Sequence, residues 1–190
     1  MVLSRPDIIA AIRRGRVRIE PALPEERVAQ VSIDLTLGRR FTKLAVKPAY
    51  LPAIHVDPSL WESKDLWETI ESDTYRLHPG AFVLAHTLER VTLPPDLVGL
   101  VEGRSGFARV GVSIHVTAPK IDPGFAGTIT LEMFNFSGVP VDLRAGIDRP
   151  AQLMLLRIST PLDVAEVYAS DSLDVFQGQE APLPQRRRNS

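Results

Sequence analysis

A short segment rich in glycine and arginine could bind an anion. Residues 104–109 read Arg-Ser-Gly-Phe-Ala-Arg and follow Gly103. Glycine lets backbone N–H groups approach an anion closely, and arginine makes bidentate contacts with phosphate oxygens. The same composition also fits an ordinary glycine turn with two solvated arginines. The pattern by itself therefore leaves both interpretations open.

Glu132 could act as a general acid or base. It lies in residues 128–134, where apolar and polar side chains alternate as in a half-buried strand. The alternation predicts one face with Ile129, Leu131 and Met133, and another with Thr128, Thr130, Glu132 and Phe134. A carboxylate among such neighbours is unusual unless it is paired or functional. The solvated face of an edge strand is the alternative interpretation.

Asp122 is a second candidate carboxylate. It begins Asp-Pro-Gly, a sequence that forms turns, and the turn alone accounts for its residue type. Its apolar neighbours Ile121 and Phe125 nevertheless predict a partly shielded position.

Short strands are expected to position these side chains. The 16 prolines and 12 glycines are spread through 190 residues, which disfavours long helices. We predict a helix over residues 4–14, capped by Ser4 and stopped by Gly15, and a second short helix over 60–70. The predicted strands are residues 31–37, 82–88, 97–101, 110–116, 128–134, 139–143 and 152–158. This spacing predicts a mainly all-β domain over residues 1–170, a sandwich, jelly roll or distorted barrel, with residues 171–190 as a mobile arm.

Composition excludes several kinds of site and partner. Without cysteine there is no disulfide, thiol catalysis or cysteine-ligated zinc, and the 4 histidines lack metal-binding spacing. The net charge of −1 argues against a nucleic-acid partner, and the arginines of residues 186–188 are expected in a solvated tail. No apolar run approaches the roughly 18–20 residues that span a membrane. Charged residues break any N-terminal signal peptide, so a cytoplasmic protein is expected.

Four motifs, in this order, resemble the dCTP deaminase and dUTPase superfamily, with a close similarity to its dCTP deaminase branch. They are Gly103 to Gly111, His115 to Ala118, Ile121 to Gly127, and Leu131-Glu132. Residues 2–4, 32–38, 77–80 and 177–179 are also similar to the family, so the resemblance covers almost the whole chain. It implies a distorted jelly roll or β-barrel of the dUTPase-like fold, assembled as a homotrimer with active sites between subunits.

The resemblance also implies a reaction, the hydrolytic deamination of dCTP to dUTP and ammonia without zinc. Glu132 would be the general acid and base, and the Ser105 hydroxyl and the backbone carbonyl of Ala118 would orient the attacking water. Arg109 would lie near this water and stabilise the ionised form of Glu132. Asp122 and Phe125 would contact the deoxyribose, and the C-terminal arm would close over the nucleotide. The implied nucleotide-binding residues are Arg104, Ser105, Gly106, Phe107, Ala108, Arg109, Asp122, Phe125, Thr130, Leu131, Glu132, Gln152, Tyr168 and Gln179. Mg²⁺ is expected with the triphosphate, held by phosphate and water; dUTP and dTTP are expected as product or inhibitor.

Departures from the family pattern concern phosphate binding and the product. Gly106 replaces the second serine of a Ser-Ser pair, and Val175 stands where the family usually has lysine. Arg149 lies in a segment that is short in the family, and it is a candidate for the missing charge.

A dUTPase or a bifunctional enzyme releasing dUMP and pyrophosphate is the alternative, with Asp122 activating the water. A non-catalytic nucleotide-binding regulator is the third hypothesis.

Overall fold

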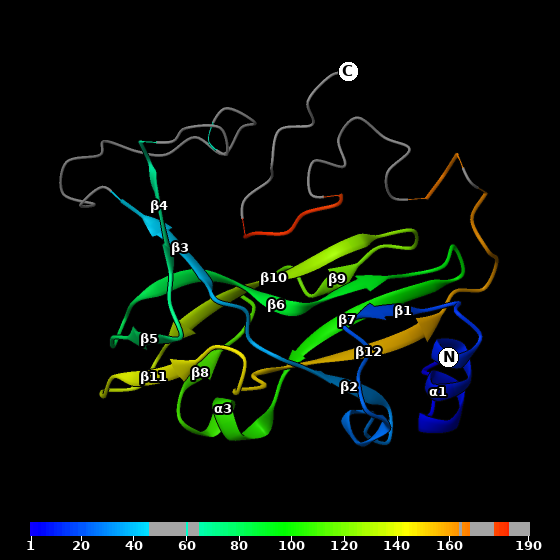
Figure 1. Cartoon of the computed structure of the whole chain (residues 1–190), viewed down its shortest axis with the longest axis horizontal. Helices are drawn as coiled ribbons and strands as arrows, with labels where there is room; N and C mark the ends of the chain where they lie inside the picture. The colour runs from blue at the N-terminus through cyan, green and yellow to red at the C-terminus, as the bar shows by residue number, and fades with distance from the viewer. Residues whose placement is uncertain (46–59, 61–64, 164, 168–176, 183–190) are drawn as a thin grey trace.

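The structure is a computed structural model that describes residues 1–45, 60, 65–163, 165–167 and 177–182. Figure 1 shows its elements. In chain order they are α1 (Arg5–Arg13), β1 (Arg18–Glu20), η1 (Glu25–Arg27), β2 (Ser32–Leu35), β3 (Arg40–Leu44), β4 (Trp67–Glu71), β5 (Thr74–Leu77), β6 (Phe82–Thr92), β7 (Leu97–Gly103), α3 (Ser105–Arg109), β8 (Val112–Ser113), β9 (Lys120–Ile121), β10 (Ala126–Asn135), β11 (Val141–Arg144) and β12 (Ala151–Arg157). The prediction of a mainly β fold with a short N-terminal helix is confirmed.

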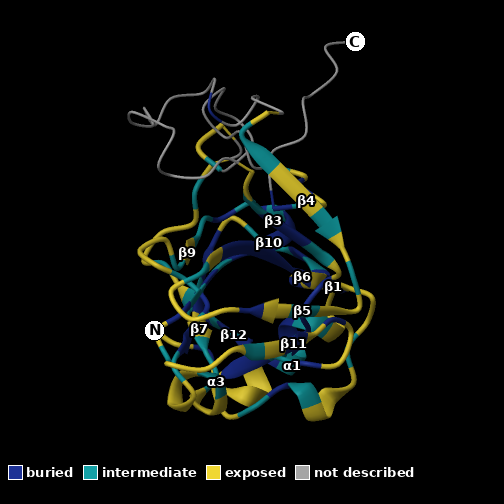
Figure 2. Cartoon of the chain, turned by 90° about the vertical axis from the view of Figure 1, so that its left-hand side faces the viewer, coloured by how far each residue is buried: buried dark blue, intermediate teal, exposed yellow. Residues whose placement is uncertain are grey.

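Two sheets enclose the core. One has the order β4-β3-β6-β10-β8, with β1 paired to β6, and the other has the order β2-β12-β7-β9. A third sheet contains β5 and β11. In Figure 1 the layer holding β6 and β10 lies above the layer holding β7 and β12, with α1 at one end and β5 and β11 at the other. In Figure 2 the buried residues lie on the strands of these layers, such as β6 and β10.

The alternation predicted for residues 128–134 is observed in β10. Ile129, Leu131 and Met133 are at most 2% exposed, and Glu132 on the opposite face is half-buried. Side chains one residue apart in a strand point to opposite faces, so the apolar set packs into the core. Glu132 pairs with Leu84 of β6 on one side of β10, whereas β8 on the other side pairs only with Phe134 and Asn135. The edge-strand interpretation therefore still fits the backbone around Glu132.

Two predicted elements are wrong. Residues 67–70, expected at the end of a helix, belong to β4, which pairs with β3. The hydroxyls of Thr42 and Thr69 are hydrogen-bonded across this pair at 2.9 Å. Residues 61–64 of that predicted helix lie outside the described residues. Of the strand predicted over 110–116, only β8 forms, because Gly111 turns the chain with a φ of 81° after the unpredicted helix α3. The short strands β1, β3, β5 and β9 were not predicted, since brief segments carry little periodic signal.

Helix α1 follows its prediction except at the cap. It buries Ile8 and Ala11, and Gly15 ends it with a φ of 68°. Ser4 stands at the N-cap, but its hydroxyl donates to the Asp7 carboxylate at 2.6 Å rather than capping a backbone N–H. Among the described helices, none is long and apolar enough to cross a membrane.

His86 is a buried titratable group inside β6. It is 8% exposed, its Nδ1 lies 2.8 Å from the Thr87 carbonyl oxygen, and its Nε2 lies 3.3 Å from the Arg40 backbone nitrogen. The Arg40 N–H can donate only to an unprotonated Nε2, so this arrangement requires the neutral imidazole with its proton on Nδ1. Burial lowers the pKa of His86 below its usual value. The ring also fills the space beside Gly38, where a Cβ atom would overlap it.

The free energy of unfolding is expected to fall as the pH drops through about 6.5, the unfolded pKa of histidine. Below that pH the imidazole of His86 is protonated in the unfolded chain but stays neutral in the folded one. The free energy of unfolding therefore falls by up to about 1.4 kcal/mol per pH unit until the pH reaches the lower pKa of the folded state. Urea unfolding at pH 5.5 and 7.5 measures the change, which His86→Gln should reduce. The exposed His78 provides the control, because His78→Gln should leave the difference as in the parent. Equal pH dependence in the parent and His86→Gln would contradict the prediction.

Candidate active site

Glu132 is held by the loop that follows β8. The backbone N–H of Val116 donates to the Glu132 carboxylate at 2.9 Å. Cross-strand pairing sets Glu132 opposite Leu84 of β6, and Thr130 opposite His86. The carboxylate thus has a fixed direction while remaining half-buried, which suits a group that must exchange protons with a substrate.

The loop beside Glu132 contains the predicted His115 to Ala118 segment. The Ser113 hydroxyl donates to the His115 carbonyl at 2.5 Å, and His115 Nε2 lies 3.5 Å from Glu102. His115 Nδ1 is buried without a hydrogen-bond partner among the described residues. The hydrogen bond from Val116 to Glu132 brings this segment to the side of β10 that carries Glu132. Ala118, two residues after Val116, is exposed.

The predicted anion-binding segment forms the short helix α3 (Ser105–Arg109) after β7. Arg104 precedes it and forms an ion pair with Asp34 of β2 at 3.3 Å. Within α3, Ser105, Gly106, Ala108 and Arg109 are exposed, and Phe107 packs against the core. A Cβ atom at Gly106 would meet nothing within 4 Å, so the missing serine side chain leaves open space.

Strand β12 anchors this segment. The Arg104 backbone N–H donates to the Pro150 carbonyl at 2.9 Å, continuing the antiparallel pairing of Ala151 with Gly103. Gln152 accepts a hydrogen bond from the Ser32 hydroxyl at 2.9 Å and donates to the Gly103 carbonyl at 3.4 Å. The oxygen and the nitrogen of the Gln152 side-chain amide thus each make a hydrogen bond that supports the segment.

Asp122 and Phe125 lie at the other end of β10. The Asp122 side chain is 36% exposed and pairs with Lys120 at 2.7 Å, which agrees with the partly shielded position predicted for it. Phe125 is 5% exposed and belongs to the core, so only a small part of its ring is open to a ligand. Leu131 is fully buried, and a ligand contact from it would have to come from its backbone.

The C-terminal residues 177–182 run along this end of β10. Gln177 accepts from the Ala126 N–H at 2.9 Å, and Gln179 donates its amide to the Thr128 carbonyl at 2.7 Å. Gln179 is 6% exposed and its Oε1 has no partner among the described residues. Thr130 Oγ1 lies 3.5 Å from the Pro182 carbonyl. Tyr168, Val175 and most of the predicted arm lie outside the described residues.

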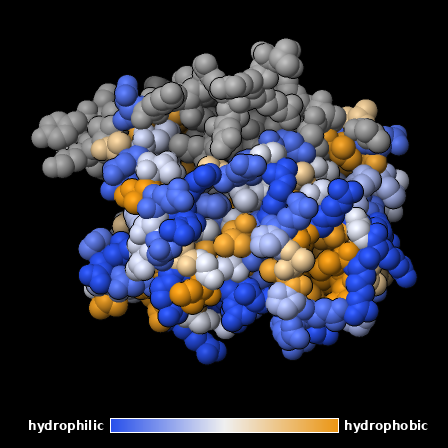
Figure 3. Space-filling view, viewed as in Figure 1, coloured by the Kyte–Doolittle hydropathy of each residue, from blue (hydrophilic) through white to orange (hydrophobic). Residues whose placement is uncertain are grey.

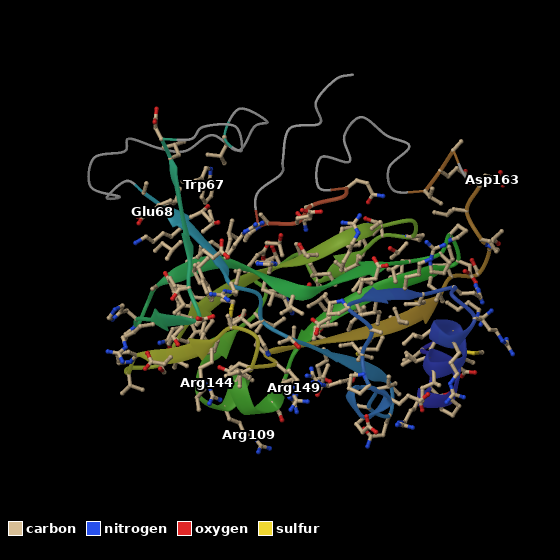
Figure 4. The ribbon with its side chains drawn as sticks, viewed as in Figure 1. Trp67, Glu68, Arg109, Arg144, Arg149 and Asp163 are labelled. Atoms are coloured by element: carbon tan, nitrogen blue, oxygen red, sulfur yellow. The ribbon has the colours of Figure 1, made fainter. Side chains whose placement is uncertain are left out.

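The predicted site residues therefore fall into separate groups within one chain. One group surrounds Glu132, a second surrounds Arg104 and Arg109, and a third lies around Asp122 and Gln179. In the part of the chain that the structure describes, no hydrogen bond or ion pair joins Glu132 to residues 104–109. Figure 4 shows Arg109 at the lower edge of the molecule, whereas β10 lies in the upper layer of Figure 1.

The carboxylates and imidazoles that the structure describes do not gather into a metal site. Among the described residues, no group of three or more histidine, aspartate or glutamate side chains could hold a metal ion. Those residues therefore offer no donor set suited to a protein-bound metal.

Comparisons with known proteins agree with the motifs. The family model described as dCTP deaminase-like matches residues 2–158. A protein of Parafrankia sp. (strain EAN1pec) named "dCTP deaminase, dUMP-forming" is 42% identical, over 98% of this chain and 90% of its own length. One of Halobacterium salinarum with the same name is 40% identical, over 99% and 95%. A "dCTP deaminase" of Haloarcula marismortui is 38% identical, over 96% and 92%.

Solved structures show the same fold. The 2'-deoxycytidine 5'-triphosphate deaminase from Agrobacterium tumefaciens aligns with a TM-score of 0.62 at 22% identity, covering 87% of this chain and 50% of that chain. A dUTPase of Staphylococcus bacteriophage 80alpha aligns with a TM-score of 0.50 at 17% identity, covering 82% and 94%. The fold is thus dUTPase-like, and the family model together with relatives near 40% identity over nearly the full length establish that this chain belongs to the dCTP deaminase-like family.

Proposed function

We propose that this protein deaminates the cytosine ring of dCTP by direct attack of water. The observation that carries the proposal is Glu132, a half-buried carboxylate on the polar face of β10 that the Val116 N–H orients at 2.9 Å. The similarity to proteins named dCTP deaminase supports the substrate.

In the proposed reaction Glu132 moves protons between water, ring and leaving group. It removes a proton from water as the oxygen attacks C4, and it delivers that proton to ring N3. It then transfers the hydroxyl proton of the tetrahedral intermediate to the 4-amino group. The C4–N4 bond breaks, and dCTP and water become dUTP and ammonia. A positioned carboxylate of this kind contributes about 10²- to 10⁴-fold in rate.

We propose that the site is completed by a second subunit of a homotrimer. Ser105 and Arg109 would orient the water from α3 of one subunit, and the Ala118 carbonyl and Glu132 would act from the neighbouring one. Exposed apolar residues near the end of β10 support a contact with another copy, since Phe136 is 74% exposed, Val139 63% and Val110 51%. Figure 3 shows further apolar surface on one face, interrupted by polar side chains.

Mg²⁺ would arrive on the triphosphate, coordinated by phosphate oxygens and water, and would neutralise part of the phosphate charge. The chain itself would contribute the positive charges of Arg104 and Arg109 to triphosphate binding.

The predictions of a cytoplasmic location, of a C-terminal arm that closes over the nucleotide, and of no nucleic-acid partner stay predictions.

A second candidate function is the further hydrolysis of dUTP to dUMP and pyrophosphate. The relatives of Parafrankia sp. and Halobacterium salinarum carry dUMP-forming names, which favours this extension over deamination alone. Asp122 would activate a water molecule for attack on the α-phosphate, and its side chain is 36% exposed beside Lys120. The P–O bond between the α- and β-phosphates would break, and pyrophosphate would leave.

The two functions are separated by following every product of dCTP. For the bifunctional enzyme we expect ammonia and pyrophosphate in equal amounts, with dUMP as the nucleotide. Asp122→Asn should reduce pyrophosphate release by about 100-fold or more, because the water loses its base, while ammonia release falls much less. Asp73→Asn, at an exposed aspartate paired with Arg39, is the control. Ammonia without pyrophosphate would leave dUTP as the product, and nucleotide binding without ammonia would support the regulator hypothesis.

A further inference from the structure

We propose that Arg149 is a phosphate-binding residue of this protein, supplying a cation beside the segment that contains Arg104. The inference rests on the proposed function, because it concerns the triphosphate of the same substrate. It deepens that proposal by adding a residue from the connection between β11 and β12.

Backbone pairing brings Arg149 to the anion-binding segment. β12 pairs with β7 from Ala151 opposite Gly103, and the Arg104 N–H extends this pairing to the Pro150 carbonyl at 2.9 Å. Arg149 is the next residue, so it stands beside the point where Ser105 begins α3. In Figure 4, Arg149 lies just above Arg109 in the lower part of the molecule.

The turn that carries Arg149 is firmly held. The buried carboxylate of Asp148 accepts hydrogen bonds from the Arg144 backbone N–H at 2.7 Å and from its guanidinium at 2.7 Å. The Leu37 N–H donates to the Asp148 carbonyl at 2.9 Å. These contacts fix the backbone immediately before Arg149, which reduces the entropy lost when the side chain binds a ligand.

The charge of Arg149 remains available. Asp148 is engaged by Arg144 and Asp34 is engaged by Arg104, whereas Arg149 forms no ion pair within the described residues. Arg149 is half-buried, so its side chain is not fully solvated. An arginine in this situation is suited to phosphate oxygens, which accept two parallel hydrogen bonds from one guanidinium.

The test compares Arg149→Gln and Arg149→Lys with the parent enzyme. Arg149→Gln is expected to raise the KM for dCTP and the inhibition constant of inorganic tripolyphosphate by about tenfold, equivalent to about 1.4 kcal/mol, with kcat within about twofold. Arg149→Lys should recover only part of the loss, because it keeps the charge but cannot donate the two parallel hydrogen bonds of a guanidinium. Arg157→Gln, at the opposite end of β12, removes the same charge and should change neither constant.

Several outcomes would overturn the proposal. They are an unchanged KM and inhibition constant in Arg149→Gln, an equal effect of Arg157→Gln, or a loss in Arg149→Gln that appears in kcat and that lysine does not recover. If the parent enzyme releases no ammonia from dCTP, the proposed function fails instead. Calorimetric binding of tripolyphosphate to the parent and to Arg149→Gln then still decides the role of Arg149.

Discussion

Replacement of Glu132 by glutamine is expected to lower kcat for ammonia release from dCTP by about a thousandfold, because a neutral amide cannot carry protons between water, N3 and the leaving group. Glutamine keeps the size of the side chain. Its amide oxygen can still accept the hydrogen bond that the Val116 N–H donates to the Glu132 carboxylate at 2.9 Å in the parent protein. The loop and the fold should therefore persist. A coupled ammonia assay measures the loss, and calorimetry with dCTP tests whether binding is retained.

The control is Glu68→Gln, at an exposed glutamate of β4 that pairs with Lys43 at 3.3 Å. This variant makes the same chemical change in a strand far along the sheet from β10 and should keep the parent kcat. If Glu132→Gln retained more than about a tenth of the parent kcat, Glu132 would not be the general base. Pyrophosphate release from dUTP, tested in parallel, should survive in Glu132→Gln if Asp122 performs that step.

Replacement of Arg109 by alanine is the second change with a large expected effect. Arg109 is exposed on α3 and makes no ion pair among the described residues, so the fold should tolerate its loss. If its guanidinium stabilises the ionised Glu132 and orients the water, as proposed, kcat should fall by about 100-fold or more. Ammonia release again measures the change, and Arg157→Ala serves as the matched control.

Mixing the two inactive variants tests whether the site is shared between subunits. In trimers assembled at random from equal amounts of Glu132→Gln and Arg109→Ala chains, about one quarter of the sites would combine an intact Glu132 with an intact Arg109 of the neighbour. Co-expression should therefore restore about a quarter of the parent activity. Activity that stays at the level of the separate variants would show that both residues act from one chain.

Much of the candidate site could be predicted from local pattern. The alternation in residues 128–134 placed Glu132 on the face opposite Leu131, and β10 confirms this because the two-residue period of a strand is a local property. The apolar neighbours of Asp122 likewise predicted its partial shielding.

Other elements could not be predicted in this way. Residues 67–71 became a strand because β3 offered a partner, and pairing between segments distant in sequence outweighed weak local preference. The segment 105–109 became helical although its glycine suggested only a turn. The role of Gln152 in nucleotide binding stays a prediction, and its side-chain contacts with Ser32 and Gly103 became visible only in the fold.

Local sequence specifies the chemical groups and their order along the chain: a carboxylate on the polar face of a strand, an arginine-rich segment, and no cysteine for a zinc site. Which of these groups meet depends on the tertiary fold. In the fold the Val116 N–H donates a hydrogen bond to Glu132. The Arg104 N–H donates to the Pro150 carbonyl, which places Arg149 beside α3. Side-chain periodicity is fixed by the backbone of one strand, whereas these contacts depend on how sheets pack and satisfy the hydrogen bonds of connecting loops.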